Sequence, residues 1–169
     1  MNMRKNDELQ NMIDGIIDKA TPWEAKLDLA ESIAEKYGAK ATAHLCSLLE
    51  SEDGQVRNAA GLALRDIKDS SAVEPLMRAI HNPQNSQNRS TLVYALSAMD
   101  CSAYFSEIVT LTLSPRPDVC GAACDVFFDQ GFYVTNEVVH QAIERVTGAK
   151  IEHDLKDGLL RRLAEFDEP

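Results

Sequence analysis

The 169-residue sequence is 44% hydrophobic and 6% aromatic, and its 17 basic against 27 acidic side chains give a formal charge of −10. That apolar content suffices for a packed core and excludes a disordered chain, while the acidic surface repels phosphate backbones and disfavours nucleic acid as a partner. No apolar run approaches the roughly 20 residues of a membrane span, and the N-terminus lacks the apolar core of a signal peptide, so we expect one cytoplasmic domain, 1–169, that does not bind membranes.

The first third of the chain predicts three helices. An apolar stripe at spacings of three and four predicts the first, which should begin near Asn6 or Asp7. The tetrapeptide TPWE then supplies a threonine cap, a proline at the first helical position and a glutamate three residues after the cap. A second helix is therefore expected over about 22–37, ending at Gly38. A third helix is expected over about 40–51.

The stretch 53–80 predicts two helices joined by a tight corner. In its first half, small and apolar residues recur at spacings of three and four and so lie on one helix face. The same spacing returns in its second half, where Ser71 and Glu74 could form a capping box. Pro75 lies about one turn into this second helix, so a bent start is expected there.

This stretch resembles the HEAT-type helical repeat of the phycobilin-lyase-like branch. The resemblance rests on the segments VRNAAGLAL, then DI, then DSSAVEPLMRAI. It implies that the aspartate and arginine of a D-x-x-x-R pattern stack between neighbouring repeats, that alanines let two helices approach closely, and that an aspartate caps the corner. The positions concerned are Asp53, Arg57, Ala59, Ala60 and Asp69.

A period in the low thirties runs through the chain. Arg57 is matched by Arg89 one period later. One period back from Arg57 falls on Lys26, and one period forward from Arg89 falls on Cys120. Such a period with paired helices is typical of an α-solenoid, in which each repeat buries its apolar face against its neighbours. We therefore expect an all-α fold, a right-handed α-solenoid of about five HEAT-like helical pairs.

The terminal pairs, near 6–37 and 135–166, are expected to cap this domain. The last pair, formed by helices near 135–147 and 152–166, lacks the D-x-x-x-R pattern at the start of its helices and places Gly158 inside a helix. Departure from the repeat pattern is typical of a terminal repeat, because its outer face meets solvent and not another repeat.

The sequence offers no catalytic or metal-binding constellation. The four cysteines include no C-x-x-C pair and are interpreted as free thiols in a reducing compartment. Cys120 and Cys124 lie one helical turn apart and could share a metal, but Cys124 also falls on the packing side and no histidine has a recognised ligand spacing. The histidines are isolated, and G-x-S-x-G, a phosphate-binding glycine loop and H-E-x-x-H do not occur. We expect no enzymatic activity, no metal and no cofactor.

The candidate site comes from comparing the second helices of the pairs, which line the inner wall in this architecture. Residues at i, i+4, i+7 and i+11 lie on one helix face. At these positions the first and fourth helices are acidic, whereas the two central ones are neutral. The four stripes are Glu24, Asp28, Glu31 and Glu35; Gln55, Ala59, Leu62 and Asp66; Gln87, Thr91, Tyr94 and Ala98; and Asp118, Ala122, Asp125 and Asp129.

An apolar centre with a tyrosine, flanked by anionic helices, has the layout of a protein-binding surface whose charged rim steers a basic partner. The alternative is that Leu62 and Tyr94 are ordinary half-buried residues, because scattered apolar side chains are common on surfaces. The predicted partner-binding residues are Glu31, Leu62, Asp66, Tyr94, Asp118, Asp125 and Asp129.

Two classes of function follow. The first is a non-catalytic binding protein for a basic protein; its most specific form is an immunity protein or antitoxin that neutralises a cationic toxin, such as a nuclease, by covering the groove meant for phosphate. The second follows the resemblance: a lyase-like or assembly-chaperone HEAT protein that holds a bilin or an apoprotein. A bilin would need basic residues for its propionates, and the predicted stripes contain none. A generic scaffold is the remaining alternative.

Overall fold

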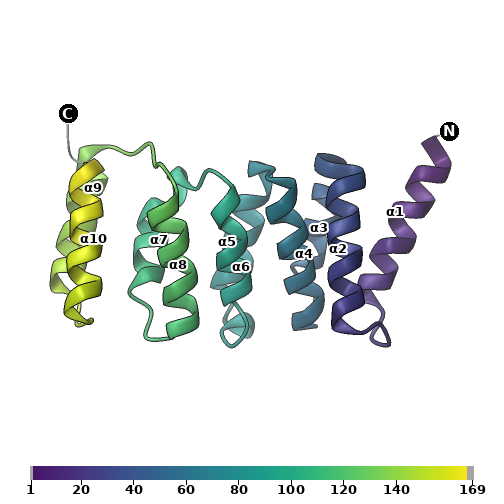
Figure 1. Ribbon diagram of the computed structural model, residues 1–169, viewed down its shortest axis with the longest axis horizontal. Helices are drawn as coiled ribbons and strands as arrows, with labels where there is room; N and C mark the ends of the chain where they lie inside the picture. Colours follow the sequence, from purple (N-terminus) through teal and green to yellow (C-terminus); the bar gives the residue numbers. More distant parts are fainter. Residues whose placement is uncertain (1, 167–169) are drawn as a thin grey trace. The chain divides into compact units, whose positions relative to one another are not determined.

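The structure, a computed structural model, describes the backbone of residues 2–166 and the side chains of residues 7–166. Its regular secondary structure is helical throughout, with no strand in these residues, which confirms the predicted all-α class. Figure 1 shows the α-helices, which are α1 (Asn2–Ile17), α2 (Trp23–Tyr37), α3 (Thr42–Leu48), α4 (Gly54–Ile67), α5 (Val73–His81), α6 (Ser90–Ala95), α7 (Phe105–Thr112), α8 (Pro117–Asp129), α9 (Asn136–Gly148) and α10 (His153–Phe166). Short 3-10 helices join them: η1 (Gly38–Ala41), η2 (Ser70–Ala72), η3 (Pro83–Asn85), η4 (Leu96–Ala98) and η5 (Ser102–Tyr104).

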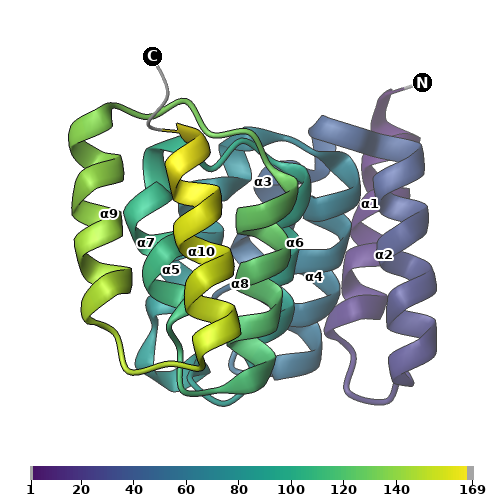
Figure 2. The same cartoon turned by 60° about the vertical axis from the view of Figure 1, so that its left-hand side comes forward.

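The chain divides into two compact units, one up to Met99 and one from Asp100 onward. The first unit contains the pairs α1/α2, α3/α4 and α5/α6, and the second contains α7/α8 and α9/α10; within each pair the two helices pack on one another. Figure 2 shows this most clearly for α9 and α10, which run side by side. These pairs have the order and spacing that the repeat predicted. That the whole chain forms one domain stays a prediction.

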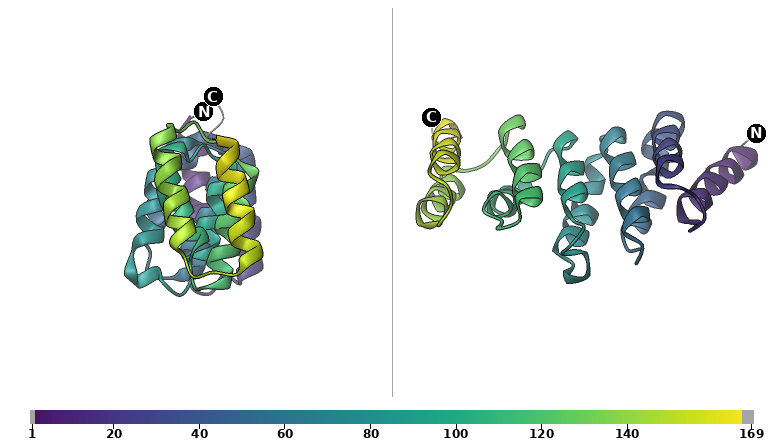
Figure 3. Two further views of the ribbon diagram at one scale, coloured as in Figure 1. Left: turned by 90° about the vertical axis from the view of Figure 1, so that its left-hand side faces the viewer. Right: turned by 60° about the horizontal axis from the view of Figure 1, so that its bottom comes forward.

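In the first unit, the second helices of successive pairs lie next to each other, α2 against α4 and α4 against α6 (Figure 3). Small residues allow this close packing, because Ala59, Ala60 and Ala63 on α4 are fully buried. A methyl group added at Gly61 would lie 3.0 Å from Leu92 Cδ2 of α6. The expectation that Ala59 faces outward is therefore wrong: α4 is covered by α2, α3 and α6, which leaves it a narrower exposed face than a helix covered on one side.

The second unit has an aromatic core. All five phenylalanines of the chain lie in it, and four of them, Phe105, Phe127, Phe132 and Phe166, are in mutual contact with ring centroids 5.2–6.2 Å apart. Each such ring pair stabilises the fold by about 0.5–1.5 kcal/mol beyond the effect of burying its apolar surface. Arg162 closes the cluster from α10, with its guanidinium 4.6 Å from the Phe166 ring centroid.

The helix ends fall close to the predicted positions, with two differences. α2 ends at its C-cap Gly38, as expected, and the φ of 51° at this residue is positive, a backbone conformation that glycine tolerates best. α1 begins at Asn2, ahead of the start predicted near Asn6, because the intervening Met-Arg-Lys favours helix. The N-cap of α2 is Pro22, and no side chain bonds to the cap, so the predicted capping by Thr21 is wrong.

Asp69 caps the corner between α4 and α5, as the resemblance implied. Its carboxylate accepts hydrogen bonds from Ser71 N (3.0 Å) and Thr42 Oγ1 (2.8 Å). Bonds from the hydroxyl and amide of Ser71, and then from Thr42, lower the pKa of Asp69. α5 begins at Val73 after η2 without a side-chain cap, so the capping box predicted for Ser71 and Glu74 does not form.

Arg57 is buried but does not pair with Asp53. Its side chain is 4% exposed, and Nη1 donates to Ser51 O at 2.5 Å. Asp53 instead caps α4 by accepting from Gln55 N at 2.8 Å. The implied aspartate–arginine stack is therefore not formed by these two residues, because the first amides of α4 and the carbonyl that follows α3 each need a partner of their own.

Lys26 and Cys120, which the repeat period relates to Arg57, also donate a hydrogen bond to a backbone carbonyl near the end of the preceding helix. Lys26 is fully buried, and its Nζ donates to carbonyl oxygens at the end of α1, including Asp18 O at 2.7 Å. The thiol of Cys120 donates to Thr112 O, the last residue of α7, at 3.1 Å. The last carbonyls of a helix have no partner within that helix, and a cation near them is further favoured by the helix dipole.

In the pairs α5/α6 and α9/α10, the side chain that donates to the first helix lies at a different position of the repeat. Asn85, in η3, donates from Nδ2 to Ala79 O of α5 at 2.8 Å, and Lys156, in α10, donates from Nζ to Thr147 O of α9 at 3.0 Å. Each of the described pairs thus has a side chain that bonds to a carbonyl at the end of its first helix or, for Arg57, in the turn that follows it. In the third pair Asn85 replaces Arg89, whose buried Nε has no hydrogen-bond partner.

Candidate protein-binding surface

Four carboxylates form a row along the exposed side of α2, and we call them the α2 acidic row. None of them takes part in an ion pair or hydrogen bond with the side chains that the structure describes. The two cations of α2 are engaged elsewhere, because Lys26 is buried at the end of α1 and Lys36 pairs with Glu8. The row is therefore an unneutralised anionic stripe. It consists of Glu24, Asp28, Glu31 and Glu35, all exposed.

The predicted neutral centre contains a cation. Leu62 is half-buried and the Tyr94 side chain is 37% exposed, as a surface anchor would be. The guanidinium of Arg65 lies over the Tyr94 ring at 4.7 Å from its centroid. It also donates from Nη1 to Asp66 Oδ1 at 3.0 Å and from Nε to Ser97 Oγ at 3.2 Å. Asp66 is thus already paired within the chain.

The stripe comparison missed Arg65 because that comparison followed positions i, i+4, i+7 and i+11, which select Leu62 and Asp66 and pass over Arg65. A long side chain reaches across to the next helix and covers surface away from its own Cα. The only sequence signal for this contact was an arginine directly before an aspartate on the exposed stripe of a central helix.

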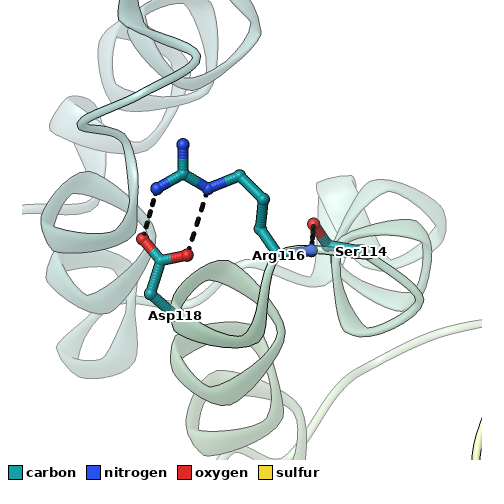
Figure 4. Close-up of polar contacts among 3 residues, drawn as sticks. All are labelled: Ser114, Arg116 and Asp118. Atoms are coloured by element: carbon teal, nitrogen blue, oxygen red, sulfur yellow. Dashed lines mark hydrogen bonds and ion pairs between the residues drawn. The ribbon is translucent and has the colours of Figure 1, made fainter.

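The predicted carboxylate Asp118, at the start of α8, is also paired within the chain. Figure 4 shows two parallel hydrogen bonds from Arg116, with Nε 3.1 Å from Oδ1 and Nη2 2.8 Å from Oδ2. Hydrogen bonding to the Asp118 carboxylate raises the pKa of the Arg116 guanidinium. The backbone amide of Arg116 donates to Ser114 Oγ at 3.3 Å, which holds the turn before α8. Asp118 is consequently a poorer target for a partner's cation than an unpaired carboxylate.

The remaining predicted residues of the second unit, Asp125 and Asp129, are exposed on α8 and form no ion pair with described side chains. Two aromatic side chains of this unit are also exposed, Phe128 at 39% and Tyr133 at 88%. The predicted site is therefore divided: Glu31, Leu62, Asp66 and Tyr94 belong to the first unit, and Asp118, Asp125 and Asp129 belong to the second.

Two observations bear on metal binding and thiol chemistry among the described side chains. No cluster of three or more histidine, cysteine or acidic residues there could hold a metal. Burial raises the pKa of Cys101 and of Cys124 to about 12, so neither is an activated thiolate near neutral pH. A cleft of about 340 Å³ in the first unit, bordered by Cys46 and Arg78, holds no such cluster either.

The helices described by the structure include none that combines the length and apolar character needed to cross a membrane. This concerns residues 2–166 only.

Comparison with known proteins identifies the repeat. A family model described as HEAT repeats matches residues 12–97, which extend from α1 to η4 and so lie within the first unit. No curated protein matches the chain. HEAT repeats suggest a protein-binding or scaffold module and are generally not enzymes. Because the match covers a little over half of the 169 residues and the helical pairs have the predicted spacing, this chain belongs to the HEAT repeat family.

Proposed function

We propose that this protein is a non-catalytic binding module for a basic protein and that the α2 acidic row attracts this partner. The observation that carries the proposal is the row itself: four exposed carboxylates on one face of a HEAT-repeat helix, with no cation of the described chain against them. A partner that brings lysine or arginine side chains would relieve the mutual repulsion of these carboxylates.

The spacing of the row suits a long-range electrostatic role. Successive carboxylates sit three or four residues apart on the helix, and neighbours at that spacing have Cβ atoms about 5–6 Å apart. This separation is shorter than the Debye length of about 8 Å at physiological ionic strength, so the four charges act together. Such a field increases association rates with oppositely charged partners and makes them salt-dependent.

The most specific form of the proposal is an inhibitor of the immunity or antitoxin type. An enzyme that binds nucleic acid uses a basic groove for the phosphates, and an acidic helix that enters this groove competes with its substrate. The formal charge of −10 supports this form. It predicts that adding the protein to its cognate nuclease abolishes cleavage at a one-to-one ratio. A neighbouring reading frame with a small basic C-terminal domain is where that nuclease should be encoded.

A matched pair of charge reversals tests the binding surface. Glu24→Lys with Glu31→Lys reverses two exposed glutamates two helical turns apart on α2, and Glu137→Lys with Glu144→Lys does the same on α9. In each pair the first glutamate is the second residue of its helix, so net charge, spacing and helix position are all equal.

The partner is isolated with the wild-type chain from extracts of the source cells, and its association rate with each variant is then measured over a salt series. The α2 reversal should slow association and flatten its salt dependence, whereas the α9 reversal should leave both near the wild-type values. An acidic partner, or equal loss in both variants, would refute the proposal.

The lyase-like alternative has one observation in its favour, the exposed cation Arg65 on α4, since a bilin propionate requires a basic residue. Arg65 is already bonded to Asp66, which reduces its availability. Titration of the protein with a free bilin, followed by its visible absorption, distinguishes this alternative: a shifted and intensified band that is lost in Arg65→Ala would favour it over protein binding.

A further inference from the structure

The three groups around the Arg65 guanidinium form the kind of site that proteins use to bind an arginine side chain. The Tyr94 ring lies under the guanidinium plane, with the Arg65 Cζ 4.7 Å from the ring centroid. Asp66 Oδ1 accepts from Nη1 at 3.0 Å, and Ser97 Oγ accepts from Nε at 3.2 Å. A planar cation with several donors along its edge matches this combination of ring, carboxylate and hydroxyl, and a lysine ammonium does not.

The site lies at the surface of the first unit and is accessible. The side chains of Arg65 and Asp66 are 34% and 45% exposed, and Tyr94 is 37% exposed. Ion pairs and cation–ring contacts at such exposure are individually weak, because water and salt compete for both partners. The Arg65 side chain can therefore leave the ring without disturbing the packing of α4, whose buried face is made by other residues.

We propose that Tyr94, Asp66 and Ser97 form an arginine subsite for the basic partner and that Arg65 occupies this subsite in the free protein. This inference rests on the proposed function and deepens it. A partner arginine binds by displacing Arg65, so Arg65 is an internal competitor that sets the affinity. The α2 acidic row lies on a helix packed against α4 and attracts the basic segment, while the subsite selects arginine over lysine.

The alternative role for Arg65 is a clip that joins α4 to η4. The two roles predict opposite effects of removing the side chain. If Arg65 is a clip, its removal should make the unit less stable, and no ligand should bind more tightly. If Arg65 is an internal competitor, its removal should let an arginine ligand bind more tightly at nearly unchanged stability.

The test uses the full-length chain and two labelled probe peptides, hexa-arginine and hexa-lysine, followed by fluorescence anisotropy. Arg65→Ala opens the subsite and frees Asp66. Arg78→Ala is the matched control, because it removes one exposed arginine of the same unit and frees Glu74, its partner at 2.9 Å, at a position with no ring beneath the guanidinium. Arg65→Gln serves as a second variant that keeps a longer side chain.

We expect Arg65→Ala and Arg65→Gln to bind hexa-arginine about three- to tenfold more tightly than the wild type. The reason is that the peptide no longer has to displace one weak ion pair and one weak cation–ring contact. The affinity for hexa-lysine should increase in the Arg65 variants only as much as it does in Arg78→Ala, because that control measures the effect of the change in net charge alone. Adding Tyr94→Leu to Arg65→Ala should remove the preference for arginine. A gain that is equal for both peptides, or no larger than in the control, would overturn the subsite.

Failure of the subsite and failure of the proposed function give different results. If the proposed function is wrong, the Glu24→Lys and Glu31→Lys reversal will weaken both peptides no more than the matched Glu137→Lys and Glu144→Lys reversal, because only the net charge then matters. If only the subsite is wrong, the α2 reversal will weaken both peptides more than the α9 reversal, and the Arg65 variants will show no arginine preference. Thermal unfolding of each variant shows that the compared chains are folded.

Discussion

Lys26 and Arg57 occupy equivalent positions in successive repeats, and each donates a hydrogen bond to a backbone carbonyl that follows the helix before its own. Both side chains are buried, and both cations have carbonyl oxygens where a carboxylate would be expected. A buried charge is costly unless it is hydrogen-bonded, and the carbonyls after α1 and α3 accept from Lys26 and Arg57, although Arg57 Nε has no hydrogen-bond partner. We therefore expect these residues to stabilise the repeat.

Lys26→Met should destabilise the first unit. Methionine preserves most of the apolar volume but leaves the carbonyls of Ile16 and Asp18 without their donor, and an unsatisfied buried acceptor costs about 1–3 kcal/mol. Urea unfolding of the variant measures this loss. Lys150→Met, at an exposed position of the second unit, is the control and should unfold like the wild type. A change of equal size in both variants would contradict the buried-donor role.

Arg57→Ala is expected to lower the free energy of unfolding by about 1–3 kcal/mol, because Ser51 O loses its donor and buried apolar contacts of the side chain are removed. Arg78→Ala removes an exposed arginine whose ion pair with Glu74 contributes at most about 1 kcal/mol. Denaturant titration compares the two variants. If Arg57→Ala kept full stability and lost partner binding, Arg57 would have to be assigned to the binding surface.

Stability should fall in acid partly through Asp69 and Asp100. Hydrogen bonds from Ser71 and from Ser102 hold the pKa of these carboxyls below the usual 3.8. Since the folded-state pKa is lower than the unfolded one, each carboxylate contributes stability above its unfolded pKa that is lost as the pH falls through the folded pKa. Between about pH 6 and pH 3, Asp69→Asn and Asp100→Asn should lose less stability than the wild type.

Urea midpoints over this pH range provide the measurement for both carboxyls. Asp125→Asn is the control, because its exposed carboxylate has no hydrogen bond to described side chains. The assignment fails if the two capping variants show the same acid dependence as the control.

Cys101 should react slowly with maleimide in the native protein. Its side chain is fully buried, and burial raises the pKa of its thiol to about 12, so the reactive thiolate is scarce near neutral pH. Cys46 is half-buried at the edge of a cleft and should be labelled faster. Mass spectrometry after timed labelling, with and without urea, compares the two sites. Equal labelling rates in the native protein would show that the second unit opens far more readily than its packing indicates.

Much of the fold could be predicted from the sequence because the contacts of a helical repeat join elements that are close in the chain. The spacing of apolar residues along each helix determined which face is buried, and the period placed Lys26, Arg57 and Cys120 at equivalent positions, where each bonds a carbonyl at the end of the preceding helix or shortly after it. The α2 acidic row follows from the same helical geometry, since exposed residues on one helix need no information about other helices.

The tertiary structure decided which of the predicted charges are available. Arg65 and Tyr94 belong to different repeats, and the guanidinium reaches the ring only because α4 and α6 approach closely at Gly61 and Leu92. The same packing covers Ala59, which helical spacing alone placed on the outward face. A long side chain has many rotamers, and the positions of neighbouring helices select one of them, so the sequence by itself determined where the carboxylates lie and the packed structure determined that Asp66 already holds a cation.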